Sequence, residues 1–218
     1  FKLFATTRVK RGPGANAPVS ATVNDTKNID IYSIFTVYIL YYLNNFKKCL
    51  TINVIKEVDM ATKILIIYYS STGNTEKMAY FIKTGAEEEG VDVKVKEVEK
   101  AGLEDMLDAD GIIIGSPTYY GTMAAPIKEF LDKSVAIHSK LDGKVGAAFS
   151  SSANIGGGNE TTIIDILNAL LIHGMVIQGD PSGGHYGVVS IGAPDSRVER
   201  ECKRLGKRIA KLVKKLHF

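Results

Sequence analysis

The chain has 218 residues, of which 45% are hydrophobic and 23% charged, a composition typical of a folded globular protein rather than a disordered one. Its two cysteines, Cys49 and Cys202, are too few for a disulfide scaffold and have no spacing that predicts a zinc site. We therefore expect no bound metal and a reducing, cytoplasmic location. The net charge of +3 is uneven, because residues 1–59 hold 8 Lys+Arg against 4 Asp+Glu and residues 60–218 hold 19 against 20. The nearly neutral second part predicts no nucleic-acid partner.

Residues 1–59 differ in pattern from the rest, and we predict an appendage over 1–59 and a domain over 60–218. The apolar run 31–43 is thirteen residues long, shorter than the roughly 20 that cross a bilayer. It has the length of a signal-peptide core but lies far from the start and lacks a small-residue cleavage site. A signal-anchor remains one interpretation of this run.

A second interpretation is that residues 1–59 are upstream DNA read in frame, or a disordered extension. Fifteen of the 23 residues from 28 to 50 are Phe, Tyr, Ile, Asn or Lys, whose codons are rich in A and T. Residues 56–59 can be encoded by a strong ribosome-binding sequence at a workable distance from the codon of Met60. This hypothesis places the start of the native protein at Met60, and amino-terminal sequencing of the native protein tests it.

From Met60 onward, strand and helix patterns alternate. Runs that are continuously apolar or alternate with period 2 predict strands, the last two forming one interrupted strand: 63–69, 91–98, 111–115, 144–149, 175–178 and 187–191. Helical spacing predicts helices over 75–89, 103–108, 126–138, 159–173 and from 195 onward. Cys202 lies on the apolar stripe of the last helix, so we expect a packed thiol.

The alternation predicts an α/β fold with a doubly wound, five-stranded parallel sheet in the order 2-1-3-4-5. Ligands of such sheets bind at the carboxyl ends of the strands, beside the point where strand order reverses. The segments that follow the first, third and fourth strands are therefore the candidate site.

The first of these segments is rich in hydroxyl groups and opens a helix. Free backbone N–H groups and the positive end of the helix dipole favour a phosphate there, and the absence of lysine excludes a nucleoside-triphosphatase loop. The alternative is a simple turn that caps the helix. The candidate phosphate-binding loop is the whole segment 70–75.

The second and third segments offer groups that suit a flat ring. In the second segment, two adjacent tyrosines could stack against an aromatic ring or pack on the protein itself. In the third segment, small residues let backbone N–H groups approach the edge of a ring. The second segment is 116–122 and the third is 150–160.

The motifs SSTGNT at 70–75, SPTYYG at 116–121 and FSSSANIGGGNE at 149–160, followed by LLIHGMVI at 170–177, carry a family resemblance. The chain resembles the flavodoxin superfamily over about residues 62–215. It is most similar to the branch of NAD(P)H:quinone oxidoreductases typified by the tryptophan-repressor-binding protein. The phosphate loop is common to flavodoxins, whereas the GGG-N-E loop with HGMVI is more specific to this branch.

The resemblance implies a flavodoxin-like fold that binds FMN through the three segments, with NAD(P)H as electron donor and a quinone or similar small molecule as acceptor. It implies that the FMN phosphate is held by Ser70, Thr72, Gly73, Asn74 and Thr75. It implies that the flavin ring is bordered by Pro117, Thr118, Tyr119, Tyr120, Gly121, Ser151, Ser152, Ala153, Asn154, Gly156 and Gly157. It also implies a homo-oligomer without membrane contact for residues 60–218, and a catalytic role for His173 at the active-site pocket. The alternative for His173 is a histidine that caps a helix end. An insertion that the branch often carries after the second strand is missing here, since 98–109 leaves no room for it. The rival function is a flavodoxin-type electron carrier, although such carriers usually have a strongly acidic surface.

Overall fold

The computed structural model describes residues 39–43 and 62–217. The chain divides into two units, Phe1–Val54 and Ile55–Phe218, which we describe separately. In the first unit, residues 39–43 are helical. The remainder of the apolar run 31–43, residues 56–59 and the predicted boundary at Met60 lie outside the described residues.

The second unit contains a seven-stranded sheet whose main path runs β2-β1-β3-β5-β6. Every pairing is parallel except that of β3 with β4. The strands are β1 (Lys63–Tyr68), β2 (Asp92–Glu97), β3 (Gly111–Tyr119), β4 (Thr122–Met123), β5 (Val145–Ser152), β6 (Val176–Ile177) and β7 (Val188–Ile191).

This sheet confirms the predicted fold class and strand order, and it differs from the prediction in one additional strand and in the length of two others. The fifth strand is made of two pieces, because β6 pairs with the start of β5 and β7 with its end. Its interruption and resumption were expected from the glycine-rich segment between them. The small antiparallel strand β4 was not expected, and β3 and β5 both continue past their predicted ends, to Tyr119 and Ser152.

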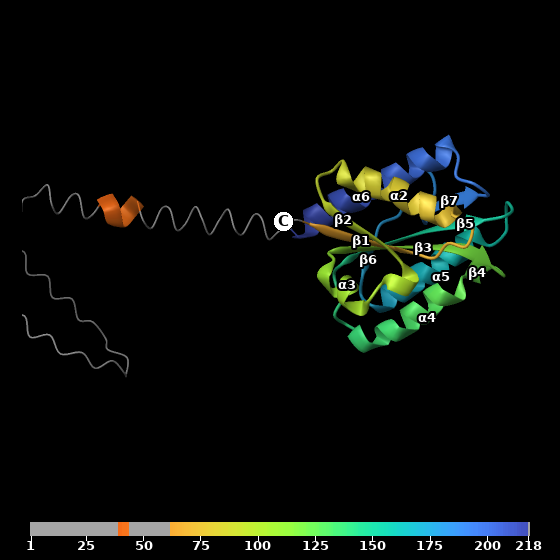
Figure 1. Cartoon of the computed structure of the whole chain (residues 1–218), viewed down its shortest axis with the longest axis horizontal. Coiled ribbons are helices and arrows are strands. Elements are labelled where there is room, and N and C mark those ends of the chain that lie inside the picture. The colour runs from red at the N-terminus through yellow and green to blue at the C-terminus, as the bar shows by residue number, and fades with distance from the viewer. Residues whose placement is uncertain (1–38, 44–61, 218) are drawn as a thin grey trace, which may run out of the picture. The chain divides into compact units, whose positions relative to one another are not determined.

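Helices cover both faces of the sheet (Figure 1). Helices α2 (Asn74–Glu87) and α6 (Ser196–His217) lie on one face, and α3 (Leu103–Asp108), α4 (Ala125–Lys133) and α5 (Asn159–Ile172) on the other. Two 3-10 turns, η1 (Val98–Lys100) and η2 (Ser134–Ile137), complete the connections. Within the ranges that the structure describes, no helix is long and apolar enough to cross a membrane.

Successive residues of the central strands supply two separate cores. Ile64 and Ile66 of β1 pack with α2 and α6, whereas Leu65 and Ile67 pack with α3, α4 and α5. All four side chains are buried. Because both faces of the sheet are covered, its strands are continuously apolar rather than alternating, as the sequence pattern indicated.

Helices α2 and α6 cross at two glycines. A Cβ on Gly85 would lie 2.1 Å from the carbonyl oxygen of Lys203, and one on Gly206 would lie 2.1 Å from that of Ile82. A side chain at either position would force the helices apart. These glycines therefore set the close packing of the upper layer in Figure 1.

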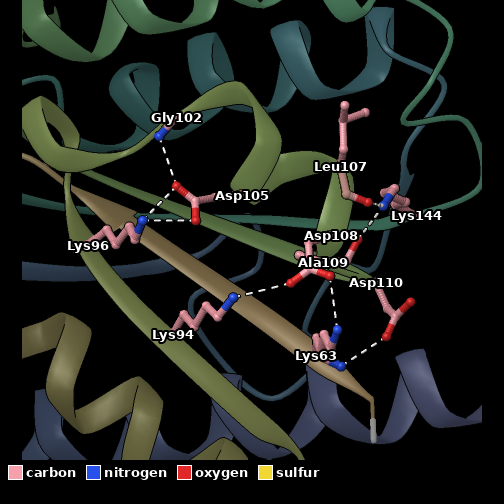
Figure 2. Close-up of polar contacts among 10 residues, drawn as sticks. All are labelled: Lys63, Lys94, Lys96, Gly102, Asp105, Leu107, Asp108, Ala109, Asp110 and Lys144. Carbon is pink, nitrogen blue, oxygen red and sulfur yellow. Dashed lines mark hydrogen bonds and ion pairs between the residues drawn. The ribbon is translucent and has the colours of Figure 1, made fainter. Parts of the chain in front are cut away.

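Lysine–aspartate contacts stabilise the end of the sheet where the strands begin (Figure 2). The carboxylate of Asp108, at the end of α3, pairs with Lys63 at 2.9 Å and with Lys94 at 3.1 Å. The ammonium group of Lys144 donates to the carbonyl of Leu107 at 2.7 Å, and burial lowers the pKa of Lys144. These contacts fix the end of α3 at the amino end of the sheet, opposite to the candidate ligand site.

Candidate functional site

The carboxyl ends of β1, β3 and β5 lie next to one another at the same end of the sheet, on the right of Figure 1. Tyr68 pairs with Gly115, and two residues further along β3, Pro117 pairs with Ser151 of β5. The three predicted segments therefore lie together at the carboxyl end of the sheet, as expected for this topology.

The first segment forms an open turn at the start of α2. Gly73 is the residue before the helix and has φ +83°, and no side chain among the described residues caps the N–H groups of the first turn. A Cβ on Gly73 would meet no atom within 4 Å, so the space beside the turn is open. The Oγ of Ser70 is buried and has no hydrogen-bond partner among the described residues.

A buried hydroxyl without a partner is costly, by about 1–3 kcal/mol, unless a ligand or water supplies one. Here it lies next to a helix end whose N–H groups lack a side-chain acceptor. Such a turn binds an anion through N–H and O–H donors and the helix dipole. Its residues fit a phosphate held by neutral donors.

The hydroxyl groups of Thr75 and Ser151 connect the first segment to the third. They share a hydrogen bond of 2.9 Å, and both residues are buried. The hydroxyls of Ser71 and Tyr119 share a second hydrogen bond of 2.5 Å, which links the first segment to the second. The phosphate turn is therefore fixed to both neighbouring segments.

The second segment forms a β-hairpin, which the sequence analysis did not predict. Thr118 pairs with Met123 and Tyr119 with Thr122, which leaves Tyr120 and Gly121 as a two-residue turn. Both turn residues have positive φ, +51° and +82°, as a type I′ turn requires. Tyr120 is fully exposed and is one of the two described non-glycine residues with positive φ.

Helix α5 anchors this hairpin. The Thr161 hydroxyl donates to the carbonyl of Gly121 at 2.6 Å, and the Thr122 hydroxyl donates to Asp165 at 2.5 Å. A Cβ on Gly158 would lie 2.6 Å from the Cα of Gly121, so the third segment and the turn are in direct contact. Thr161 and Asp165 were missed in the sequence because nothing local marks a helix residue as the partner of a distant turn.

The third segment begins inside β5 and then becomes exposed. Ser151 and Ser152 are buried, whereas Ala153 to Gly157 are exposed to solvent. The Ser152 hydroxyl donates to the carbonyl of Asn154 at 3.0 Å, and the N–H of Gly157 donates to the same carbonyl at 3.2 Å. These bonds fold the exposed part back on itself.

The side chain of Thr118 is engaged within the protein. Its hydroxyl lies 3.0 Å from the Ser150 hydroxyl and accepts from the Thr162 hydroxyl at 3.0 Å. Pro117 is buried in β3. A cofactor contact from Thr118 would therefore come from its backbone.

Within this chain, the structure places His173 away from the other predicted site residues. His173 follows the last residue of α5, and the N–H of Gly143, ahead of β5, donates to Gly174 at 3.1 Å. The 14 residues of α5 span about 21 Å, so the histidine lies at the end of the sheet where the strands begin, opposite to the three segments. It is buried and hydrogen-bonded to Ser134, which agrees better with the alternative of a helix-end histidine.

Tyr68, the last residue of β1, fixes the first turn of α2. Its phenol donates to Glu76 at 3.0 Å. Burial and the Glu76 carboxylate raise the pKa of Tyr68, so its phenol stays neutral and keeps donating.

Comparisons with known proteins agree with this architecture. Residues 100–184 match the family model described as NADPH-dependent FMN reductase. A flavodoxin of Aquifex aeolicus is 43% identical over 160 residues, covering 69% of this chain and 86% of its own. An NAD(P)H dehydrogenase (quinone) of Archaeoglobus fulgidus is 36% identical over 188 residues, covering 71% and 98%. A solved flavodoxin from the domain Archaea has a TM-score of 0.60 and 34% identity, and covers 70% of this chain and 99% of its own.

The alignments to these two relatives differ in length. The alignment to the dehydrogenase runs over 188 residues, 28 more than the alignment to the flavodoxin, for nearly the same share of this chain. The dehydrogenase therefore contains residues for which this chain has no counterpart, in agreement with the missing insertion.

The residues of the candidate site fit FMN: a turn whose buried Ser70 hydroxyl has no partner among the described residues lies beside exposed aromatic and glycine-rich segments. Identity and coverage both exceed what a shared fold alone would give. The chain therefore belongs to the flavodoxin superfamily of FMN-binding proteins, close to its NAD(P)H:quinone oxidoreductase branch.

Proposed function

We propose that residues 60–218 form an FMN-dependent oxidoreductase that takes electrons from NAD(P)H and reduces a quinone or a similar small acceptor. The observation that carries this proposal is the buried Ser70 hydroxyl, which has no partner among the described residues and lies at the start of α2. The name of the A. fulgidus relative supports the donor and acceptor.

In this proposal the first segment binds the phosphate of FMN. Ser70 donates its hydroxyl, and the N–H groups at the start of α2 donate to the remaining oxygens. Thr75 orients the turn through its bond to Ser151. The proposed phosphate residues are Ser70, Thr72, Gly73, Asn74 and Thr75.

The second and third segments border the ring, and the bound flavin supplies the redox chemistry. Tyr119 is partly exposed and Tyr120 fully so, so a flat ring can stack on them. Exposed N–H groups of the third segment reach the ring edge. The proposed ring residues are Pro117, Thr118, Tyr119, Tyr120, Gly121, Ser151, Ser152, Ala153, Asn154, Gly156 and Gly157.

A flavodoxin-type electron carrier is the second candidate. It is supported by the length comparison, because the chain matches the A. aeolicus flavodoxin without the additional residues that the dehydrogenase contains. A carrier would exchange electrons with redox proteins and would turn over no small substrate of its own.

Steady-state oxidation of NADH and NADPH by the full chain loaded with FMN, with and without benzoquinone, tests the proposal. The oxidoreductase predicts nucleotide oxidation that quinone stimulates and that Tyr120→Ser reduces. Tyr80→Ser, which alters an exposed tyrosine on α2, is the matched control and should leave the rate unchanged. A yellow protein that dithionite reduces but that is slow with both nucleotides would favour the carrier.

A further inference from the structure

The carboxylate of Glu76 lies in the first turn of α2 but leaves the N–H groups of that turn uncapped. Glu76 is the third residue of the helix. An acidic side chain at this position commonly turns back and accepts from N–H groups at the start of its own helix. In α2 no side chain among the described residues does so, and the Glu76 carboxylate accepts from the phenol of Tyr68 at 3.0 Å instead.

Two other helices of the chain have a carboxylate on their first N–H groups. In α3, Asp105 is also the third residue, and its carboxylate accepts from the N–H of Gly102 at 2.9 Å (Figure 2). In α6, the Asp195 carboxylate accepts from the N–H of Val198 at 2.8 Å. The start of α2 differs from both because its acidic residue is bonded to another element.

The phenol of Tyr68 is a fixed donor for this carboxylate. Tyr68 is the last residue of β1 and packs in the core that α2 and α6 cover. It is 7% exposed, so packing holds its ring in place. Burial and the Glu76 carboxylate raise the pKa of the phenol, which therefore stays neutral and keeps its proton.

We infer that Tyr68 is a positioning residue for the phosphate turn, because it holds the Glu76 carboxylate away from the N–H groups that would bind the phosphate of FMN. This inference rests on the proposed function. Without the phenol, the carboxylate competes for these N–H groups as an internal anion of the helix. It must then leave before the turn can bind another anion. Tyr68 therefore affects the affinity for the phosphate and not the affinity for the ring.

Titrations of the cofactor-free full chain with FMN and with riboflavin, which lacks the phosphate, test this inference. Tyr68→Phe removes only the hydroxyl and should weaken FMN binding about fivefold, the ratio that one capping hydrogen bond supplies, with riboflavin binding unchanged. Tyr68→Phe/Glu76→Ala should restore FMN affinity at least to the wild-type value, because no carboxylate remains to compete. Tyr80→Phe removes an exposed phenol from α2 and is the matched control, which should change neither affinity.

The double variant separates positioning from packing. If Glu76→Ala does not restore the affinity that Tyr68→Phe loses, the phenol acts through packing and the inference is wrong. Unchanged FMN affinity in Tyr68→Phe would also overturn it. If the wild type binds FMN no better than riboflavin, the phosphate turn of the proposed function fails, and this inference fails with it.

Nuclear magnetic resonance of the cofactor-free chain gives a second measurement that needs no flavin. In Tyr68→Phe the amide protons at the start of α2 should move downfield, because they donate to the Glu76 carboxylate. The same change should be absent from Tyr68→Phe/Glu76→Ala. Amide resonances of Tyr68→Phe that match those of the double variant would show that the released carboxylate does not turn back, and would contradict the role of Tyr68.

Discussion

The hydroxyl groups of Thr75 and Ser151 lie 2.9 Å apart, although the two residues are 76 positions apart in the chain. Thr75 is in the first turn of α2 and Ser151 near the end of β5. Both residues are buried, so this bond connects the phosphate turn to the third segment inside the protein. The geometry of the proposed FMN site thus depends on a contact between its first and third segments.

Removing this bond should weaken both folding and cofactor binding. We expect Thr75→Val to lower the free energy of unfolding by about 1 kcal/mol, because the Ser151 hydroxyl loses a buried partner. FMN affinity should fall as well. Thr84→Val, which removes an exposed hydroxyl bonded within α2, is the matched control and should have little effect on either quantity. Urea denaturation of Thr75→Val, Ser151→Ala and the double variant measures the coupling, and additive effects would contradict a direct bond.

The contact between Gly158 and the hairpin turn should tolerate no side chain. Gly158→Ala would place a Cβ 2.6 Å from the Cα of Gly121 at a residue with φ +93°. We expect a loss of stability above about 1 kcal/mol and a weakened flavin site. Gly156→Ala adds a Cβ at φ +66° with no atom within 4 Å, so it isolates the cost of backbone strain. Equal thermal stability of the two variants would show that the close approach does not matter.

His173 should make stability depend on pH. Burial and His138 hold its folded pKa below the usual 6.5, so between the folded pKa and 6.5 the unfolded chain binds more protons. The free energy of unfolding should therefore fall as pH falls below 6.5, by at most about 1.4 kcal/mol per pH unit from this group. His173→Asn should reduce this slope, and Leu171→Asn, an exposed neighbour, should retain it. Denaturation curves from pH 7.5 to 5 measure the slopes, and identical slopes for wild type and His173→Asn would refute the assignment.

Cys202 should be unreactive until the protein unfolds. It is fully buried between α6 and the sheet, and this burial raises the pKa of its thiol. In a Cys49→Ser background, labelling by a thiol reagent should be more than about 100-fold slower in buffer than in strong denaturant. Labelling at the same rate in both conditions would place Cys202 at the surface.

The sequence predicted the sheet because its signals are local and repeated. The apolar runs at 63–69 and 111–115 predict strands that are buried on both faces, and β1 and β3 are buried in the structure. The hairpin at Tyr120 was not predicted, because its turn lacks the Asn-Gly or Asp-Gly pair that marks a type I′ turn. A tyrosine with positive φ is held there by Thr161 and Asp165, which are distant in sequence.

Within this chain, His173 lies apart from the segments with which the family resemblance groups it. The motif placed the histidine at the pocket, but the helix before it leads away from the pocket edge by about 21 Å. The helix predicted over 159–173 implies the same distance, because an α-helix rises 1.5 Å per residue. This rise alone therefore predicts that His173 lies at the opposite end of the sheet from the pocket.

The most direct test of the account is a titration of the cofactor-free full chain with FMN and with riboflavin, which lacks the phosphate. The account predicts that FMN binds at least about tenfold more tightly, because only its phosphate satisfies Ser70 and the start of α2. Ser70→Ala should reduce this preference. Equal affinity for the two flavins, or no binding of either, would contradict the phosphate turn and with it the proposed site.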